Sequence, residues 1–235
     1  MYNMDAQVRY SEVDSDGIIT LDAIVNYLQD CVMLHSESVG RGVLNIDKNE
    51  GFWLMASWQV DIIRAPRYHE IIRVATNPYE FKGVFGGRNV QIFDAGGEQL
   101  VRANSMWVYI DAATRAPARV PKHEAEAYTH FSDKIDMEYM RRKITLPDGM
   151  TECVPIPVTP DRIDTNGHVN NCEYVRVAME AAKFYGLPRV LRVEYKQAAV
   201  VGDDFCPEMY RDEKHCVVEI HGRDKTPFAV VEFIF

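Results

Sequence analysis

The chain repeats itself, and this repeat limits the folds open to its 235 residues more than any other feature of the sequence. Asp14-Ser-Asp-Gly17 matches Asp164-Thr-Asn-Gly167 at an offset of 150 residues, with apolar residues flanking both. Further on, residues 60–64 match residues 193–197 at an offset of 133 residues. The matched segments keep their order, so we predict two copies of one structural unit.

Each matched tetrapeptide precedes the pattern of one amphipathic helix. Apolar residues recur at three- and four-residue steps over residues 21–39 in the first copy and over residues 174–182 in the second. Residues typical of helix ends flank both stretches. The expected start and stop are Thr20 and Gly40 for the first helix, and Asn170 or Asn171 and then Gly186-Leu-Pro188 for the second.

Strand-like segments with turns between them follow each helix, and this order predicts an α+β fold in which a long helix packs on an antiparallel sheet, twice. We expect the domains at residues 1–120 and 151–235. The charged, proline-bounded stretch 121–150 is the expected connector, with a short helix near residues 122–128. The expected strands are residues 53–64, 70–77, 88–94 and 100–111, then 190–197, 204–210, 215–221 and 227–235.

Charge and cysteine content argue against several classes of function. A net charge of -9 opposes binding to nucleic acid. The five cysteines are scattered without the spacing of a zinc site or a disulfide framework, so we expect no metal and no cofactor. No apolar run approaches the roughly 20 residues that a membrane span needs, and the first residues include neither a basic leader nor an apolar stretch. We therefore expect a cytoplasmic protein.

The segment Asp164-Thr-Asn-Gly-His-Val-Asn-Asn171 is the densest polar cluster of the chain, and it lies where a turn leads into a predicted helix. Backbone N–H groups at a helix start are partly positive and can hold a carbonyl oxygen as it becomes an oxyanion. A carboxylate, a carboxamide and an imidazole at alternate positions can supply orientation, polarisation and proton transfer. These groups suit the hydrolysis of an activated carbonyl.

The same octapeptide also has a purely structural interpretation. Asp-x-Asn-Gly is typical of an Asx turn, and a single histidine in a turn is more often structural than catalytic. The repeat favours the functional interpretation, because the first copy carries Ile18 where the second carries His168.

The octapeptide resembles the D-x-N-x-H-V-N-N motif of acyl-acyl carrier protein (ACP) thioesterases, a family of plant plastid enzymes and bacterial relatives. The resemblance covers essentially the whole chain and rests on several separate segments in the same order. These segments are residues 8–14, 26–30, 53–60, 105–111 with Thr114-Arg115, and 192–196.

This resemblance implies a tandem, or double, hotdog fold and the hydrolysis of fatty acyl-ACP to free fatty acid and holo-ACP in fatty acid biosynthesis. It also implies that the second domain is catalytic and that the first shapes the acyl pocket. By position, the family's catalytic residues fall on Asp164, Asn166 and His168. Our hypothesis is that His168 acts as general base on water, Asn166 holds the oxyanion or carbonyl, and Asp164 orients one of the other two.

One departure from the family matters for the mechanism. The plant enzymes have a Glu-Cys pair where this chain has Ala198 and Ala199. A cysteine nucleophile therefore does not carry over, and a carboxylate that could serve as base is missing. Cys172 does not match that position, and a cysteine at the start of a helix is more often a small buried residue. The identity of the base and a catalytic role for Asp14 of the first copy stay open.

The acyl chain and the carrier each need a surface of their own. Trp53, Met55 and Trp58 are candidates to line an apolar pocket, although each alone is more typical of ordinary core. The carrier protein of this family is strongly acidic, so its docking to a chain of charge -9 needs a local basic surface. The candidate docking residues are Arg141, Arg142 and Lys143 in the connector, and Arg189, Arg192 and Lys196 beside the expected site.

Two other functions stay open. The first is an acyl-CoA thioesterase with the same site. The second is a non-catalytic acyl-binding hotdog module, an idea that Ala198 and Ala199 suggest. The sequence specifies neither the acyl chain length nor the oligomeric state, for which a homodimer is one option.

Overall fold

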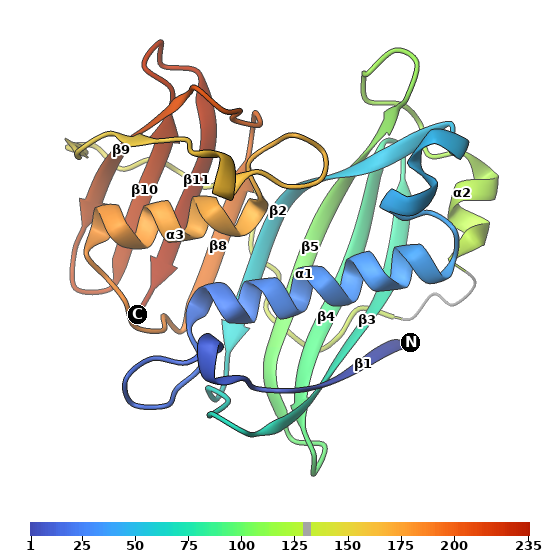
Figure 1. Ribbon diagram of the computed structural model, residues 1–235, viewed down its shortest axis with the longest axis horizontal. Coiled ribbons are helices and arrows are strands. Elements are labelled where there is room, and N and C mark those ends of the chain that lie inside the picture. Colours follow the sequence, from blue (N-terminus) through green and yellow to red (C-terminus); the bar gives the residue numbers. More distant parts are fainter. Residues whose placement is uncertain (129–132) are drawn as a thin grey trace. The chain divides into compact units, whose positions relative to one another are not determined.

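The computed structural model describes residues 1–128 and 133–235, and its elements are labelled in Figure 1. The contacts within the chain define two compact units. Two short segments of the N-terminal half group with the second unit. The first unit contains Met1–Ile19, Ala23–Ala56 and Val60–Met140, and the second contains Thr20–Asp22, Ser57–Gln59 and Arg141–Phe235.

The first unit packs helix α1 (Leu21–Ser38) on an antiparallel sheet. The helix buries its apolar stripe, and the Cys31 thiol donates to the Val74 carbonyl of the sheet at 3.5 Å. Gly40 takes a φ of +72° just beyond the helix, as expected of a C-terminal glycine. The strands are β1 (Tyr2–Gln7), β2 (Gly51–Ile62), β3 (Ile71–Lys82), β4 (Phe85–Asp94) and β5 (Gln99–Asp111), in the order β1-β3-β4-β5-β2.

Strand β1 is absent from the sequence prediction. Its six residues alternate between exposed and half-buried, so no fully buried apolar run marks it as a strand. The register with β3 fixes it instead, because Tyr2 pairs with Thr76 and Gln7 pairs with Ile71. The expected short helix is present as α2 (Lys122–Ala127), and the 3₁₀ segments are η1 (Tyr10–Glu12) and η2 (Val43–Lys48).

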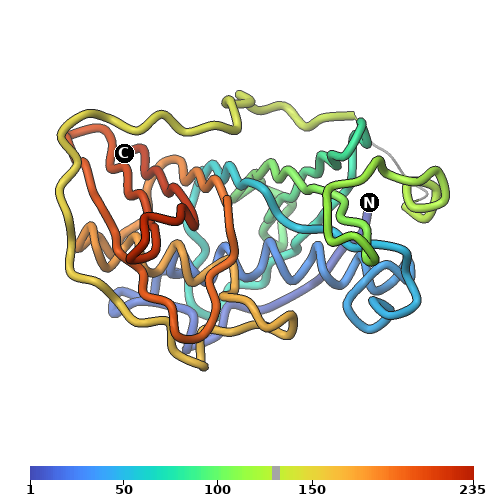
Figure 2. Tube along the Cα trace, turned by 90° about the horizontal axis from the view of Figure 1, so that it is seen from above, coloured from blue at the N-terminus to red at the C-terminus, as the bar shows by residue number. Residues whose placement is uncertain are grey.

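Residues 133–140 run along the face of the first sheet that lies away from α1, as Figure 2 shows. They are tied to β4 by the Asn89 carboxamide. Its Oδ1 accepts from the Tyr139 hydroxyl at 3.0 Å and from the Ile135 N–H at 3.3 Å. This part of the predicted connector is therefore a packed layer of the first unit.

The second unit repeats the arrangement with helix α3 (Asn171–Ala182) on its own antiparallel sheet. The helix packs on β9, β10 and β11. The strand order is β8 (Val190–Tyr195), β11 (Pro227–Ile234), β10 (His215–His221), β9 (Asp204–Arg211) and β6 (Thr151–Glu152), and β7 (Ile156–Pro157) also pairs with β9. The predicted α+β fold is confirmed.

Helix α3 is shorter than predicted. It ends at Ala182, before the predicted stop at Gly186 and Pro188, because Lys183 takes the left-handed conformation with a φ of +48°. The Phe184 ring then packs against Phe233 and Phe235, with ring centroids 5.6 and 5.0 Å away, and this contact turns the chain out of the helix. Within the described residues, no helix has the length and apolar character needed to cross a membrane.

The two helix ends predict opposite effects of glycine and alanine. Lys183→Gly removes a side chain from a left-handed residue, so we expect the free energy of unfolding to rise by about 0.5–1 kcal/mol. Gly40→Ala forces a side chain into the same conformation, so we expect a loss of about 1 kcal/mol. Urea denaturation of both variants measures the two shifts. A Lys183→Gly protein less stable than wild type would contradict this account of the end of α3.

Candidate active site

The octapeptide forms a tight turn that leads into α3. The turn follows η3 (Pro160–Arg162) and is closed by the Asp164 carboxylate. Its Oδ1 accepts the backbone N–H of Asn166 at 2.8 Å and that of His168 at 3.3 Å. The Asp164 N–H donates to the His168 carbonyl at 2.7 Å, and Gly167 takes a φ of +76°. Three predicted catalytic residues therefore share one backbone-locked turn.

The first copy builds the same turn from different side chains. Asp14 Oδ1 accepts the N–H groups of Asp16 and Ile18, both at 2.9 Å. The Asp14 N–H donates to the Ile18 carbonyl at 2.8 Å, and Gly17 takes a φ of +71°. Because the carboxylate does this work in a copy without an imidazole, closing the turn is the shared role of Asp14 and Asp164.

The second copy differs in what the turn presents to solvent. Asn166 and His168 are exposed, and Asn166 Nδ2 lies 3.5 Å from Asp164 Oδ2. The imidazole makes no hydrogen bond or ion pair with any residue that the structure describes. A histidine with open ring nitrogens can take up and release a proton near neutral pH. The arrangement can thus provide a base and a carboxamide donor on one surface.

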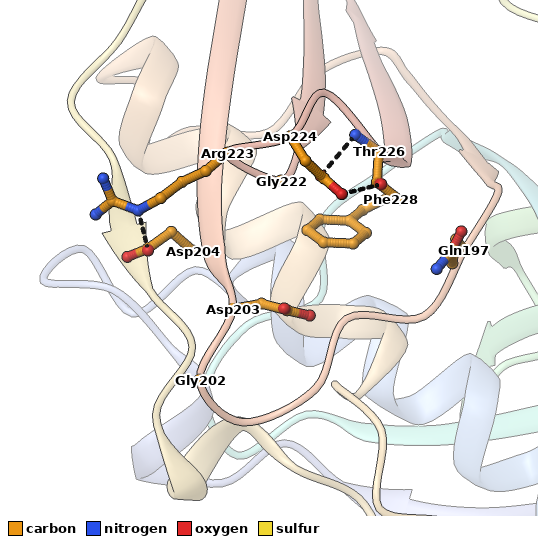
Figure 3. A pocket seen from close by; sticks show the side chains of 9 residues that line it. All are labelled: Gln197, Gly202, Asp203, Asp204, Gly222, Arg223, Asp224, Thr226 and Phe228. Atoms are coloured by element: carbon orange, nitrogen blue, oxygen red, sulfur yellow. Dashed lines mark hydrogen bonds and ion pairs between the residues drawn. The ribbon is translucent and has the colours of Figure 1, made fainter.

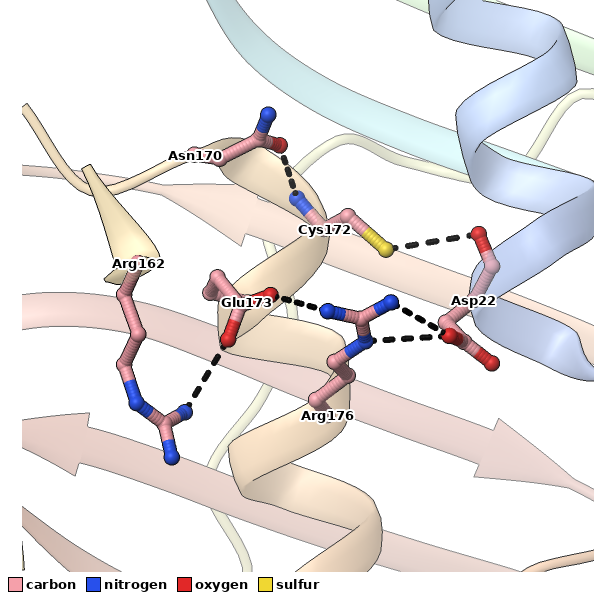
Figure 4. Close-up of polar contacts among 6 residues, drawn as sticks. All are labelled: Asp22, Arg162, Asn170, Cys172, Glu173 and Arg176. Atoms are coloured by element: carbon pink, nitrogen blue, oxygen red, sulfur yellow. Dashed lines mark hydrogen bonds and ion pairs between the residues drawn. The ribbon is translucent and has the colours of Figure 1, made fainter. Parts of the chain in front are cut away.

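The start of α3 is fixed by a charged network that the sequence analysis missed (Figure 4). The Asn170 side chain caps the helix by accepting the Cys172 N–H at 3.0 Å. Glu173 accepts from Arg162 at 3.0 Å and from Arg176. The i,i+3 spacing of Glu173 and Arg176 was a readable signal for part of this network.

Arg176 also reaches Asp22 of the same unit, with Nη2 at 2.7 Å and Nε at 3.0 Å from the carboxylate. Burial opposes ionisation of Asp22, but hydrogen bonds from Thr20 and Arg176 outweigh it and lower the pKa of Asp22. Asp22 lies 154 residues from Arg176, so no local pattern could have paired them.

Cys172 is unsuited to act as a nucleophile. Its side chain is buried, and its thiol donates to the Asp22 carbonyl at 3.4 Å (Figure 4). A reactive cysteine needs access to substrate and a group that favours the thiolate, and a carbonyl acceptor favours the thiol instead.

The loop after β8 carries Ala198 and Ala199 and hydrogen-bonds to the turn. Ala199 O accepts the Val169 N–H at 3.0 Å, and the Ala199 N–H donates to the Tyr174 hydroxyl at 2.9 Å. Burial raises the pKa of Tyr174 to about 12, and the Asp164 and Asp203 carboxylates add to the rise. The hydroxyl is therefore neutral at ordinary pH.

Asp203 is the next carboxylate along this loop, and its role is structural. Its Oδ2 accepts the Val200 N–H at 2.9 Å, which closes the turn between them. In the first copy Glu70 does the same for the Arg67 N–H at 2.9 Å, again at an offset of 133 residues. A group with this duty in both copies does not replace the carboxylate missing at Ala198.

A cavity of about 250 Å³ lies between this loop and the turn from β10 to β11 (Figure 3). Asp203 points into it, and its rim carries the ion pair between Arg223 and Asp204. None of the three predicted catalytic residues lines it. Among the described residues, no group of three His, Cys, Asp or Glu side chains is placed to hold a metal ion. The lining residues are Gln197, Gly202, Asp203, Asp204, Gly222, Arg223, Asp224, Thr226 and Phe228.

The predicted pocket residues are divided between the two units. Trp53 is half-buried in the first unit, where its indole N–H donates to Glu124 at 2.8 Å. Met55 is buried in the same unit. Trp58 groups with the second unit, is only 2% exposed, and has no hydrogen-bond partner for its indole N–H among the described residues.

The predicted docking residues differ in exposure. Arg141, Arg142, Lys143, Arg189 and Lys196 are all exposed. Arg192 is only 8% exposed, pairs with Glu232, and donates to the carbonyl oxygens of Arg141 and Lys143. Its charge is thus neutralised within the second unit, and we leave it out of the docking surface.

Comparison with known proteins adds independent information. The family model of the acyl-ACP thioesterase N-terminal domain matches residues 1–128. The palmitoyl-acyl carrier protein thioesterase of Gossypium hirsutum is 26% identical over 195 residues, which cover 77% of this chain and 47% of that protein. The chain spans about half the length of the curated relatives that head this comparison.

Solved structures share the fold along the whole chain. An acyl-ACP thioesterase from Bacteroides thetaiotaomicron has a TM-score of 0.87 at 20% identity, covering 99% of this chain and 96% of that chain. The 12:0-ACP thioesterase from Umbellularia californica has a TM-score of 0.86 at 18% identity, with the same coverage of both chains. Because the family model matches more than half of its residues, this chain belongs to the acyl-ACP thioesterase family.

Proposed function

We propose that this protein hydrolyses fatty acyl thioesters carried by ACP and releases free fatty acid and holo-ACP. The observation that carries the proposal is the exposed imidazole of His168 beside the carboxamide of Asn166, on a turn that Asp164 locks at the start of α3. The first copy has the turn without either group. Membership of the family supports the same reaction.

In the proposed reaction, His168 takes a proton from a water molecule, and the water oxygen attacks the thioester carbonyl carbon. The resulting oxyanion is stabilised by Asn166 Nδ2 and by the positive end of the α3 dipole. The carbon–sulfur bond then breaks, and the imidazolium returns its proton to the departing thiolate. Water has then supplied a hydroxyl to the acyl carbon and a hydrogen to the sulfur.

Direct attack by water is favoured over an acyl-enzyme intermediate. Ala198 and Ala199 offer no nucleophile, and the buried Cys172 thiol is bonded to a backbone carbonyl. Asp164 serves the reaction by holding the backbone of both other residues, so its role is positional. We also propose, as the family resemblance implies, that the first unit shapes the acyl pocket, with Trp53 and Met55 among its lining.

A non-catalytic acyl-binding module is the alternative that Ala198 and Ala199 favour, because those positions lack every polar side-chain atom. An acyl-CoA thioesterase is the other. Thiol release from acyl-ACP and acyl-CoA substrates over a range of chain lengths separates the three functions. Tight acyl binding without thiol release would identify the module.

The proposed roles predict large losses of turnover without loss of fold. We expect His168→Ala to lower kcat by about 10²- to 10⁴-fold, because a general base contributes that much. We expect Asn166→Ala to lower it by roughly 10²- to 10³-fold, the value of one oxyanion donor. Thiol release measures kcat, and thermal melting checks the fold.

Matched controls come from the first copy. Asp16→Ala and Ile18→Ala change the equivalent positions there, and we expect both to stay within about threefold of the wild-type kcat. If His168→Ala kept wild-type turnover, the assignment of the base would be wrong. A large loss in Asp16→Ala would instead place chemistry in the first copy.

Docking of an acidic carrier predicts a salt effect. We expect the combined Arg141→Glu, Arg142→Glu and Lys143→Glu variant to raise the KM for acyl-ACP by about tenfold or more, because these exposed cations would steer an acidic partner. The KM for a neutral acyl-pantetheine thioester should not change. Added salt should weaken the wild type toward the variant. Equal losses with both substrates would exclude docking as the cause, and Lys48→Glu serves as the exposed control.

A further inference from the structure

The peptide group of Ala199 is held on both sides. Its N–H donates to the Tyr174 hydroxyl at 2.9 Å, and its carbonyl accepts the Val169 N–H at 3.0 Å. Ala199 and Val169 are buried, and Tyr174 is only 2% exposed. The Tyr174 ring is fixed in the core, edge-on to Tyr195 and Phe205, with ring centroids 5.7 and 5.6 Å away. A rigid side chain thus holds the loop against the turn.

The first copy makes half of this connection. Its Ile19 N–H donates to the Pro66 carbonyl at 3.0 Å. Ile19 corresponds to Val169 at the helix offset of 150 residues, and Pro66 corresponds to Ala199 at the strand offset of 133 residues. The bond from turn to loop is therefore common to both copies.

The other half differs, and the two differences match. A proline has no N–H, and the helix of the first copy has Ile24 where the second has Tyr174. In the second copy Ala199 has a buried N–H that needs an acceptor, and the Tyr174 hydroxyl supplies it. One copy lacks both donor and acceptor, and the other has both.

We propose that Tyr174 is a positioning residue for the proposed hydrolysis, acting through Ala199 and Val169 on His168. This inference rests on the proposed function. Val169 directly follows His168, so the Ala199 carbonyl fixes the chain on one side of the imidazole while Asp164 fixes the other. Without the hydroxyl, the Ala199 N–H loses its acceptor, and the loop must shift to reach water. A displacement of the reacting groups by about 1 Å can cost roughly 10²-fold in rate.

The first test is Tyr174→Phe, which removes only the hydroxyl. We expect kcat for the thioester to fall by about 10- to 100-fold while KM changes by less than about threefold, because the acyl and carrier surfaces are untouched. In the His168→Ala background the same change should cost nothing further, since it acts through the imidazole. An independent loss in that background would overturn the proposal.

The repeat supplies a rescue variant. Ala199→Pro added to Tyr174→Phe recreates the donor-free pairing of Ile24 and Pro66, and it keeps the carbonyl that Val169 needs. Ala65 precedes Pro66 as Ala198 precedes Ala199, so the loop sequence is already compatible with proline. We expect kcat within about threefold of wild type. A folded double variant as slow as Tyr174→Phe would overturn the proposal.

Tyr195→Phe is the matched control. It also removes a hydroxyl from the same core, one that donates to the Asn171 carbonyl at 3.0 Å and does not reach Ala199. We expect its kcat to stay within about threefold of wild type. An equal loss in both phenylalanine variants would show a general effect on the core and would overturn the proposal.

Amide hydrogen exchange tests the positioning without any assay of activity. In Tyr174→Phe we expect faster exchange at residues 167–170 and 197–200, with β10 and β11 unchanged. Unaltered exchange in those two segments would overturn the proposal even if the rescue variant failed to fold. If the wild type released no thiol from any acyl thioester, the proposed function would fail, and the exchange result would still decide whether Tyr174 holds the turn.

Discussion

The bond from an aspartate carboxylate to two backbone N–H groups is the interaction on which the site depends. Asp164 makes it to Asn166 and His168, and Asp14 makes it in the first copy. Because the accepting groups are backbone amides, the turn tolerates different side chains at the second and fourth positions after the aspartate. The fold therefore supplies a fixed platform twice, and the side chains on it decide what each copy can do.

The internal repeat makes it possible to separate structure from chemistry within one chain. A contact present in both copies serves the fold, as the capping carboxylates of Asp203 and Glu70 show. A group found in one copy alone is available for chemistry, and His168 is such a group. This comparison removes Asp203 as a substitute base and reduces Asp164 to a positioning role.

Periodicity predicted the helices, most strands and the catalytic turn, because these depend on local spacing. It missed β1, whose residues are never fully buried, and it extended α3 beyond Lys183, where a non-glycine residue takes a positive φ. It treated Arg192 as a surface charge, since a buried pair with Glu232 40 residues away leaves no local signal. The contacts around Ala199 were likewise hidden, because strand and helix follow different offsets.

The two alanines after β8 narrow the mechanism. With no carboxylate at Ala198 and with Asp203 committed to a backbone N–H, His168 is the only side chain on the catalytic turn that can accept a proton from water near neutral pH. A site with one base has no second group to correct its aim, so the backbone must hold the imidazole accurately. The bonds from Asp164 and Ala199 on either side of it meet that requirement, which explains why the loop stays anchored to the turn although its own side chains carry no chemistry.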